Sequence, residues 1–102
     1  MAVLVDACLW HRWERRWCHC VSDVSLDELH DFAERLGVPR RAFQGDHYDL
    51  HEEGREAAIS LGAEAVSTRE LLRRLKAAGL RLGPEERRAR KLTDPDGAVS
   101  PP

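Results

Sequence analysis

The segment Gly45-Asp46-His47-Tyr48-Asp49 gathers the side chains of this sequence best suited to catalysis. The imidazole of His47 titrates near neutral pH, which suits a general acid or base, and Asp46 or Asp49 could fix its tautomer. The phenol of Tyr48 could donate a hydrogen bond to an oxyanion or a phosphate. We therefore predict His47, Tyr48 and Asp49 as catalytic residues. An equally weighted interpretation is a loop whose polar groups satisfy its own backbone and whose Tyr ring is buried.

Binding of a divalent metal is a second chemistry that the histidines and carboxylates allow. An open hydrolytic site needs imidazole and carboxylate ligands at one point, with a coordination position left for water or substrate. We predict such a site from His19, His47 and Asp6, with Asp49 as the alternative to Asp6. A divalent metal is accordingly the cofactor that these residues suggest.

Cys8, Cys18 and Cys20 offer another ligand set, which with His11 would make a closed structural zinc site. On a strand, however, Cys18 and Cys20 share one face while the imidazole between them lies on the other. The two-residue spacing of a zinc knuckle is missing, and an odd number of cysteines disfavours a disulfide framework. We therefore favour thiols that pack as small hydrophobic groups.

Basic side chains supply further candidates for ligand binding. Arg40 and Arg41 form a guanidinium pair that could bind a phosphate, although such pairs are also ordinary on solvated surfaces. His30 flanks the apolar stripe of a helix, where a histidine is more often structural. We include His30, Arg40 and Arg41 with Asp6 and His19 as predicted ligand-binding residues.

Alternating strand and helix patterns predict where these residues lie. Capping boxes begin helices at Ser25 and Ser67, and glycines at 37 and 79 end them. The expected elements are strands at 2–5, 17–21, 42–44 and 63–66, an ordered loop or short helix at 7–16, and helices within 25–37, 51–61 and 67–78.

This alternation predicts a single α/β domain with a three- or four-stranded, mostly parallel sheet and about three helices. Ligands of such sheets bind beyond the carboxyl ends of the strands. That edge would collect Asp6, Asp23, residues 46–49 and the cap at Ser67. We therefore predict that the functional groups meet at this edge.

Length and charge limit the function classes. The 102 residues suffice for one core, so we expect a domain over residues 1–83 and a mobile or partly helical tail over 84–102. Short apolar runs and the lack of a secretory pattern predict a cytoplasmic protein without a membrane partner. The formal charge of −2 argues against strong non-specific nucleic-acid binding. Three tryptophans in so short a chain favour core packing or a homodimer contact.

Several short motifs together resemble a family of bacterial and phage domains of unknown function, DUF4031. They are the opening Val5-Asp6, a Trp-x-His at 17–19 before Ser22-Asp23, Glu28-Leu29-His30, Asp46-His47-Tyr48-Asp49 and Leu61-Gly62-Ala63, within a similarity from about Val3 to Leu80. The resemblance implies importance for the matching positions Asp6, His19, His30 and 47–49, and it brings no activity with it. Cys8 and Cys20 depart from the family pattern, which argues against a shared cysteine–zinc role.

Two functions from different classes compete on this sequence. The first is a small His/Asp-based hydrolase or transferase, metal-assisted in one version, that acts on a phosphate- or nucleotide-like small molecule. The second is a non-catalytic ligand-binding or adaptor module. The sequence leaves open whether the protein is an enzyme.

Overall fold

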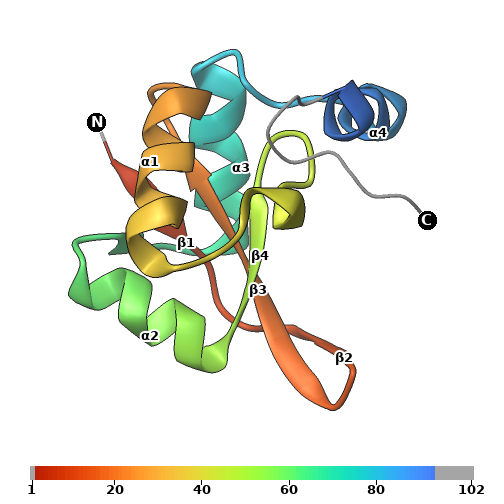
Figure 1. Ribbon diagram of the computed structural model, residues 1–102. Coiled ribbons are helices and arrows are strands. Elements are labelled where there is room, and N and C mark those ends of the chain that lie inside the picture. The colour runs from red at the N-terminus through yellow and green to blue at the C-terminus, as the bar shows by residue number, and fades with distance from the viewer. Residues whose placement is uncertain (1, 94–102) are drawn as a thin grey trace.

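A computed structural model describes residues 2–93 and consists of a mixed sheet with helices on both faces (Figure 1). Within these residues the strands are β1 (Val3–Val5), β2 (Trp10–Arg12), β3 (Arg15–Ser22), β4 (Tyr48–His51) and β5 (Glu64–Ala65). The helices are α1 (Leu26–Leu36), α2 (Glu52–Ser60), α3 (Thr68–Ala77) and α4 (Pro84–Thr93), with a 3-10 turn at Arg40–Ala42. The predicted α/β class is confirmed, but the described residues form five strands and four helices, where three or four strands and about three helices were expected.

Strand β3 is the centre of the sheet. β2 and β1 pair with it in succession along one edge, β4 pairs with the other edge, and all three pairings are antiparallel. Only β5, which adds to β1, forms a parallel pair in the described part of the chain. The prediction of a mostly parallel sheet is therefore wrong.

A hairpin explains this difference. Residues 7–16 were expected to form a loop or short helix, but they contain β2 and a tight turn that leads directly into β3. Trp13 and Glu14 both adopt positive φ, 54° and 61°, as a type I′ turn requires. Such turns usually carry Asn-Gly or Asp-Gly, so the Trp-Glu pair gave no sequence signal.

The segment before β4 also differs from the expectation. In place of the predicted strand at 42–44, the chain has the end of a 3-10 turn at Ala42 and an isolated antiparallel bridge between Phe43 and Tyr48. The amide of Gln44 donates to the carbonyl of His47 (2.8 Å), and Gly45 turns the chain at a φ of +100°. β4 then starts at Tyr48, so the polar segment enters a strand instead of following one.

The two faces of the sheet carry separate cores. Cys18 and Cys20 point to the face covered by α1 and α2, and Val21 points to the face covered by α3. This is the alternation that the sequence predicts for β3. His19, between the two cysteines, consequently lies on the face of the sheet that α3 partly covers, which we call the α3 face.

Local signals for the helices are confirmed. The Ser25 hydroxyl accepts from the amide of Glu28, and Gly37 ends α1 at a φ of +81°. Ser67 caps α3 through the amide of Glu70. These interactions depend on residues close in sequence, which is why they could be foreseen.

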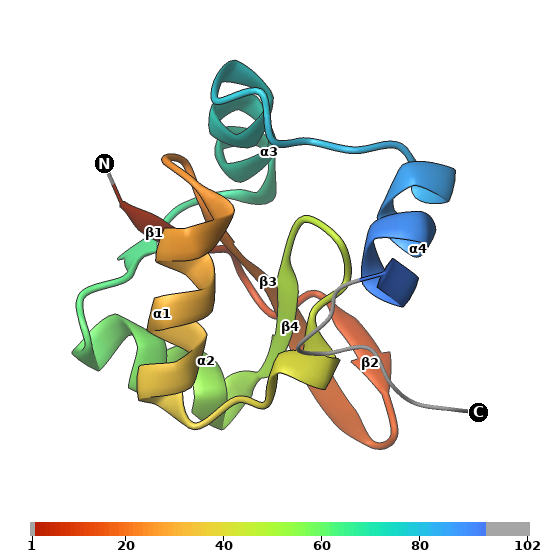
Figure 2. The same ribbon diagram turned by 45° about the horizontal axis from the view of Figure 1, so that its top comes forward.

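Helix α4 lies beside the turn that precedes β4 (Figure 2). The Lys91 ammonium donates to Oε1 of Gln44 (3.0 Å), and none of the residues 84–92 is buried. The first part of the predicted tail is thus helical, and residues 94–102 lie outside the described residues. Over residues 2–93, every helix is too short or too polar to cross a membrane.

Candidate metal centre

His19 is held by Asp6 at an irregularity in the sheet. Between β1 and β2 the chain leaves regular pairing with β3, and the carboxylate of Asp6 takes over as acceptor for the backbone N–H of His19 (2.6 Å). Its second oxygen lies 2.8 Å from Nδ1 of His19 and accepts from the Thr68 hydroxyl (2.7 Å). Burial disfavours the charged carboxylate, but these hydrogen bonds outweigh it and lower the pKa of Asp6.

His47 is held in the same way by its neighbour Asp46. The fully buried carboxylate lies 2.7 Å from Nδ1 of His47, and its other oxygen accepts from the amide of Leu82 (3.0 Å). Arg81 approaches that second oxygen at 3.6 Å. Burial opposes the charge of Asp46, yet the bonds from His47 and Leu82 and the charge of Arg81 lower its pKa.

The two histidines meet Asp49 on the α3 face. The imidazole rings of His19 and His47 stand edge to face with centroids 5.2 Å apart, and Asp49 pairs with His19 across β3 and β4. One donor atom from each of His19, His47 and Asp49 lies within 4.8 Å of the other two. No other group of three or more His, Cys, Asp or Glu residues among the described residues approaches this closely.

The carboxylate of Asp49 has an unsatisfied oxygen. Oδ1 is buried and accepts no hydrogen bond from the described residues, although it lies 3.1 Å from Nε2 of His47. Burial disfavours the imidazolium form of His47, but the two flanking carboxylates, Asp46 and Asp49, outweigh burial and raise its pKa. A buried acceptor without a donor calls for an explanation, and a cation between Nε2 and Oδ1 is one.

The donor set fits a divalent metal. A carboxylate can only accept, so Asp6 and Asp46 hold a proton on Nδ1 of His19 and of His47, and a metal ion would take the place of the proton that Asp49 favours on Nε2 of His47. A histidine that binds a metal usually donates its other ring N–H to a group such as a carboxylate, which fixes the orientation of the ring. Two ligand atoms of a tetrahedral zinc ion are about 3.3 Å apart, close to the 3.1 Å contact in this cluster.

A small cavity of about 130 Å³ opens beside the two histidines. Val21 and three leucines of α3 form its apolar wall, and Arg81 adds a guanidinium that is about one-third exposed. Three protein ligands next to a cavity match the pattern of catalytic metal sites, which keep a coordination position open.

The predicted metal ligands map onto this cluster with one difference. His19 and His47 are brought together as expected, and Asp49 is the carboxylate of the cluster. Asp6 lies behind His19, with hydrogen bonds to both of its oxygens. Sequence reasoning missed the contributions of Thr68 and Leu82, because neither residue type nor spacing signals a bond to a carboxylate so distant in sequence.

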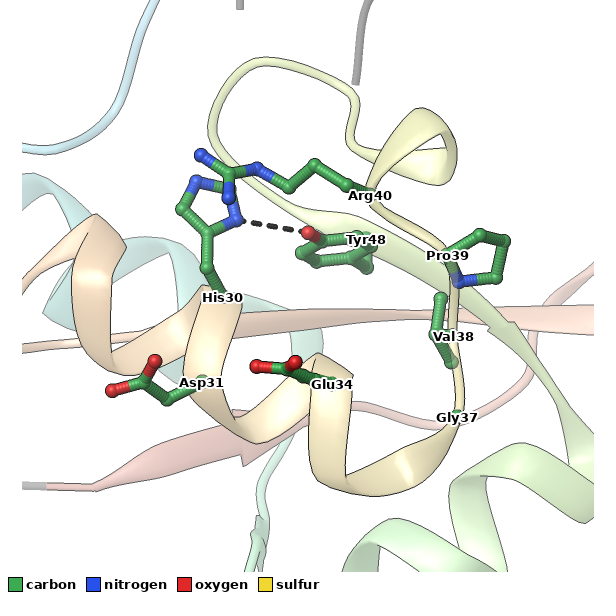
Figure 3. Close-up of a pocket in the computed structure, with 8 residues that line it drawn as sticks. All are labelled: His30, Asp31, Glu34, Gly37, Val38, Pro39, Arg40 and Tyr48. Carbon is green, nitrogen blue, oxygen red and sulfur yellow. Dashed lines mark hydrogen bonds between the residues drawn. The ribbon is translucent and has the colours of Figure 1, made fainter. Parts of the chain in front are cut away.

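Tyr48 points away from the cluster. It is 1% exposed, on the opposite face from Asp49, and its hydroxyl is hydrogen bonded to Nδ1 of His30 (2.8 Å). Figure 3 shows this pair at a second cavity of about 540 Å³, which Arg40 also lines. His30 and Arg40 therefore lie apart from His47, and the exposed Arg41 lines neither cavity.

The cysteines lie in the opposite core. Cys18 and Cys20 are buried and Cys8 is half-buried, all as free thiols. Burial raises the pKa of Cys20 to about 12, and burial together with the nearby Cys8 raises the pKa of Cys18 further. Neutral thiols packed among apolar side chains agree with the preferred interpretation from the sequence.

Comparison with known proteins identifies the family model described as "Protein of unknown function (DUF4031)", which matches residues 3–78. No curated protein and no solved structure matches the chain.

Proposed function

This chain belongs to the DUF4031 family, a family of unknown function, and we propose from its geometry that it binds one divalent metal ion and hydrolyses a phosphate ester. The ligands are Nε2 of His19, Nε2 of His47 and Oδ1 of Asp49. The observation that carries the proposal is the buried, unsatisfied Oδ1 of Asp49, 3.1 Å from a nitrogen whose ring is already oriented by Asp46. The proposal keeps the His/Asp chemistry expected from the sequence, with His47 as a metal ligand and not as a general acid or base.

The chemistry follows from the environment of the ligands. His19, His47 and Asp49 would hold a divalent ion that would supply a water of lowered pKa and polarise a phosphoryl oxygen. Asp6 and Asp46 hold the Nδ1 protons of the two imidazoles, so that Nε2 can face the ion, and fix the ring planes. The leucine wall of α3 forms one apolar side of the site, and Arg81 offers a guanidinium to a non-bridging phosphate oxygen.

Metal binding is tested on the metal-stripped full chain by calorimetric titration with Zn²⁺ and with Mn²⁺. We expect one ion per chain. Asp49→Asn and His47→Ala should weaken affinity by more than the roughly 10- to 100-fold that loss of an outer-shell partner costs. His11→Ala is the matched control, because His11 is exposed on β2 and outside the cluster, and it should bind as the wild type does.

Hydrolysis is then followed with a chromogenic phosphomonoester and a chromogenic phosphodiester. Release of the chromophore should require the metal and should be lost in Asp49→Asn. Absence of metal binding, or unchanged binding in the Asp49 and His47 variants, would overturn the proposal in favour of a structural Asp46–His47–Asp49 ion cluster.

A further inference from the structure

The α3 face continues beyond α3 onto the β2–β3 hairpin. This hairpin extends away from α1 and α3 (Figures 1 and 2). Residues paired across neighbouring strands share a face, so three rows follow one another from the turn to the metal cluster. The rows are Arg12 with Arg15, then Trp10 with Trp17 and His51, then His19 with Asp49. We call these seven residues the open face; all are exposed or half-buried.

Aromatic rings dominate the middle of the open face. Trp10 lies against the metal-site residue His19, with ring centroids 4.6 Å apart, and Trp17 contacts His51 at 5.9 Å. At the turn, Trp13 is 72% exposed, and the guanidinium of Arg12 lies 4.4 Å above its ring. One exposed and two half-buried indole rings beside arginines form a combination that can hold unpaired bases and their phosphates.

The local charge of the hairpin differs from the charge of the whole chain. Residues 10–17 contain three arginines against one glutamate, whereas the chain carries a formal charge of −2, and two of these arginines, Arg12 and Arg15, lie in the open face. Glu52 and Glu53, at the start of α2, line a hollow together with Arg15 and His51, so they offset part of the positive charge at that side of the hairpin. The expectation of weak nucleic-acid binding was based on the net charge, and a single basic surface is sufficient to attract a phosphate backbone.

We propose that the open face binds a single-stranded polynucleotide and leads its phosphodiester backbone to the His19–His47–Asp49 cluster. This inference rests on the proposed function for the chemistry and specifies its substrate. The strand must be single, because bases can stack on the tryptophans only when they are unpaired. In the cleavage step the oxygen of water bonds to phosphorus, one P–O ester bond breaks, and the leaving alkoxide takes up a proton.

Binding is tested separately from catalysis by titrating the full chain with oligothymidylate and with oligouridylate in EDTA at low salt. All three tryptophans of the chain lie within residues 10–17, so quenching of their fluorescence reports directly on the hairpin. We expect saturable quenching by at least one of the two oligonucleotides, which also distinguishes DNA from RNA. Affinity should fall steeply as salt is added.

The hairpin offers a matched pair of variants. Arg15 lies in the open face, whereas Arg16 is the next residue on the same strand and points to the other face. Arg15→Ala and Trp13→Ala should each weaken binding at least about fivefold, with Arg16→Ala close to wild type. Trp13 and Arg15 are exposed, so neither change should unfold the domain.

Several results would overturn the inference: no binding, equal losses in Arg15→Ala and Arg16→Ala, tighter binding of duplex DNA, or tighter binding of an acidic peptide. Metal binding without oligonucleotide binding would refute the proposed polynucleotide substrate and would still support the proposed metal centre. Oligonucleotide binding with the expected variants, but without metal binding, would support the open face and refute the proposed hydrolysis.

Discussion

At the scale of single residues, the site depends on two buried carboxylates that orient two imidazoles. Asp6 reaches His19 from a break in strand pairing, and Asp46 reaches His47 from the adjacent position in sequence. Both carboxylates also accept a hydrogen bond from the α3 region or the segment that follows it, through Thr68 and Leu82. The tautomer of each histidine is therefore fixed by groups from several elements.

Asp46→Asn tests this orienting role. The amide has one acceptor oxygen, so its NH₂ group must face either Nδ1–H of His47 or the amide of Leu82. We expect one metal ion still to bind, with affinity reduced about 10- to 100-fold, measured by calorimetric titration. Asp27→Asn, at an exposed position of α1, is the control. Wild-type affinity in Asp46→Asn would show that Asp46 does not position the ligand.

At the scale of elements, the turn before β4 lies against α4. Gly45 has a φ of +100°, and a Cβ added there would lie 2.6 Å from both Cα and the carbonyl oxygen of Arg87. Because Arg87 contributes backbone atoms, a side-chain rotation cannot relieve the clash. The turn and α4 can keep their arrangement only with glycine at this position.

Gly45→Ala should therefore displace α4 as well as strain the turn. Gly62→Ala is the matched control, since Gly62 has a φ of +111° with nothing within 4 Å of an added Cβ. Conformational strain alone should lower the free energy of unfolding of the control by about 1–2 kcal/mol. Gly45→Ala should lower the free energy of unfolding by more than this and should show faster amide exchange over residues 85–93. Equal losses and unchanged exchange would contradict a close contact with α4.

The elements also show which parts of the structure were predictable. Helix ends at Ser25, Gly37 and Ser67 follow from short-range hydrogen bonds, and they were predicted correctly. The hairpin was missed because its turn uses Trp13 and Glu14. β3 follows β2 directly, without the crossover that a parallel pair needs, so β3 runs antiparallel to its neighbours β1, β2 and β4.

The candidate site was predictable to a similar degree. His19, His47 and Asp49 could be singled out by residue type and by alternation along strands. The position of Asp6 behind His19 depends on a break between β1 and β2 that no local pattern signals. Tyr48 was grouped with His47 because the segment was expected to be a loop, whereas strand geometry turns successive side chains to opposite faces.

At the scale of the whole molecule, two kinds of contact hold α3 on the sheet: an ion cluster around Arg74 and the packing of its leucines in the core. Nη2 of Arg74 donates to Oδ2 of Asp23 (2.7 Å), and Nη1 donates to Glu64 of β5 (3.2 Å). The other oxygen of Asp23 accepts from the amide of Ala2 (2.8 Å). Asp23 thus links the end of β3, the start of the described chain and the helix that forms the wall of the metal-site cavity.

This link should make global stability sensitive to acid. Burial opposes the charge of Asp23, but the hydrogen bonds from Ala2 and Arg74 outweigh burial and lower its pKa below the ordinary 3.8. A lowered pKa in the folded state stabilises the fold above the pKa of the unfolded chain, and this contribution is lost as pH falls through the folded pKa. Asp23→Asn should therefore lower the free energy of unfolding by about 1 kcal/mol at neutral pH. Urea denaturation at a series of pH values should show the difference from wild type shrinking toward zero as the solution is acidified below the pKa of folded Asp23.

Asp31→Asn, at an exposed site in the middle of α1, should change the free energy of unfolding little at any pH. A difference between wild type and Asp23→Asn that stays constant with pH would mean that the charge of Asp23 does not contribute to holding α3 on the sheet.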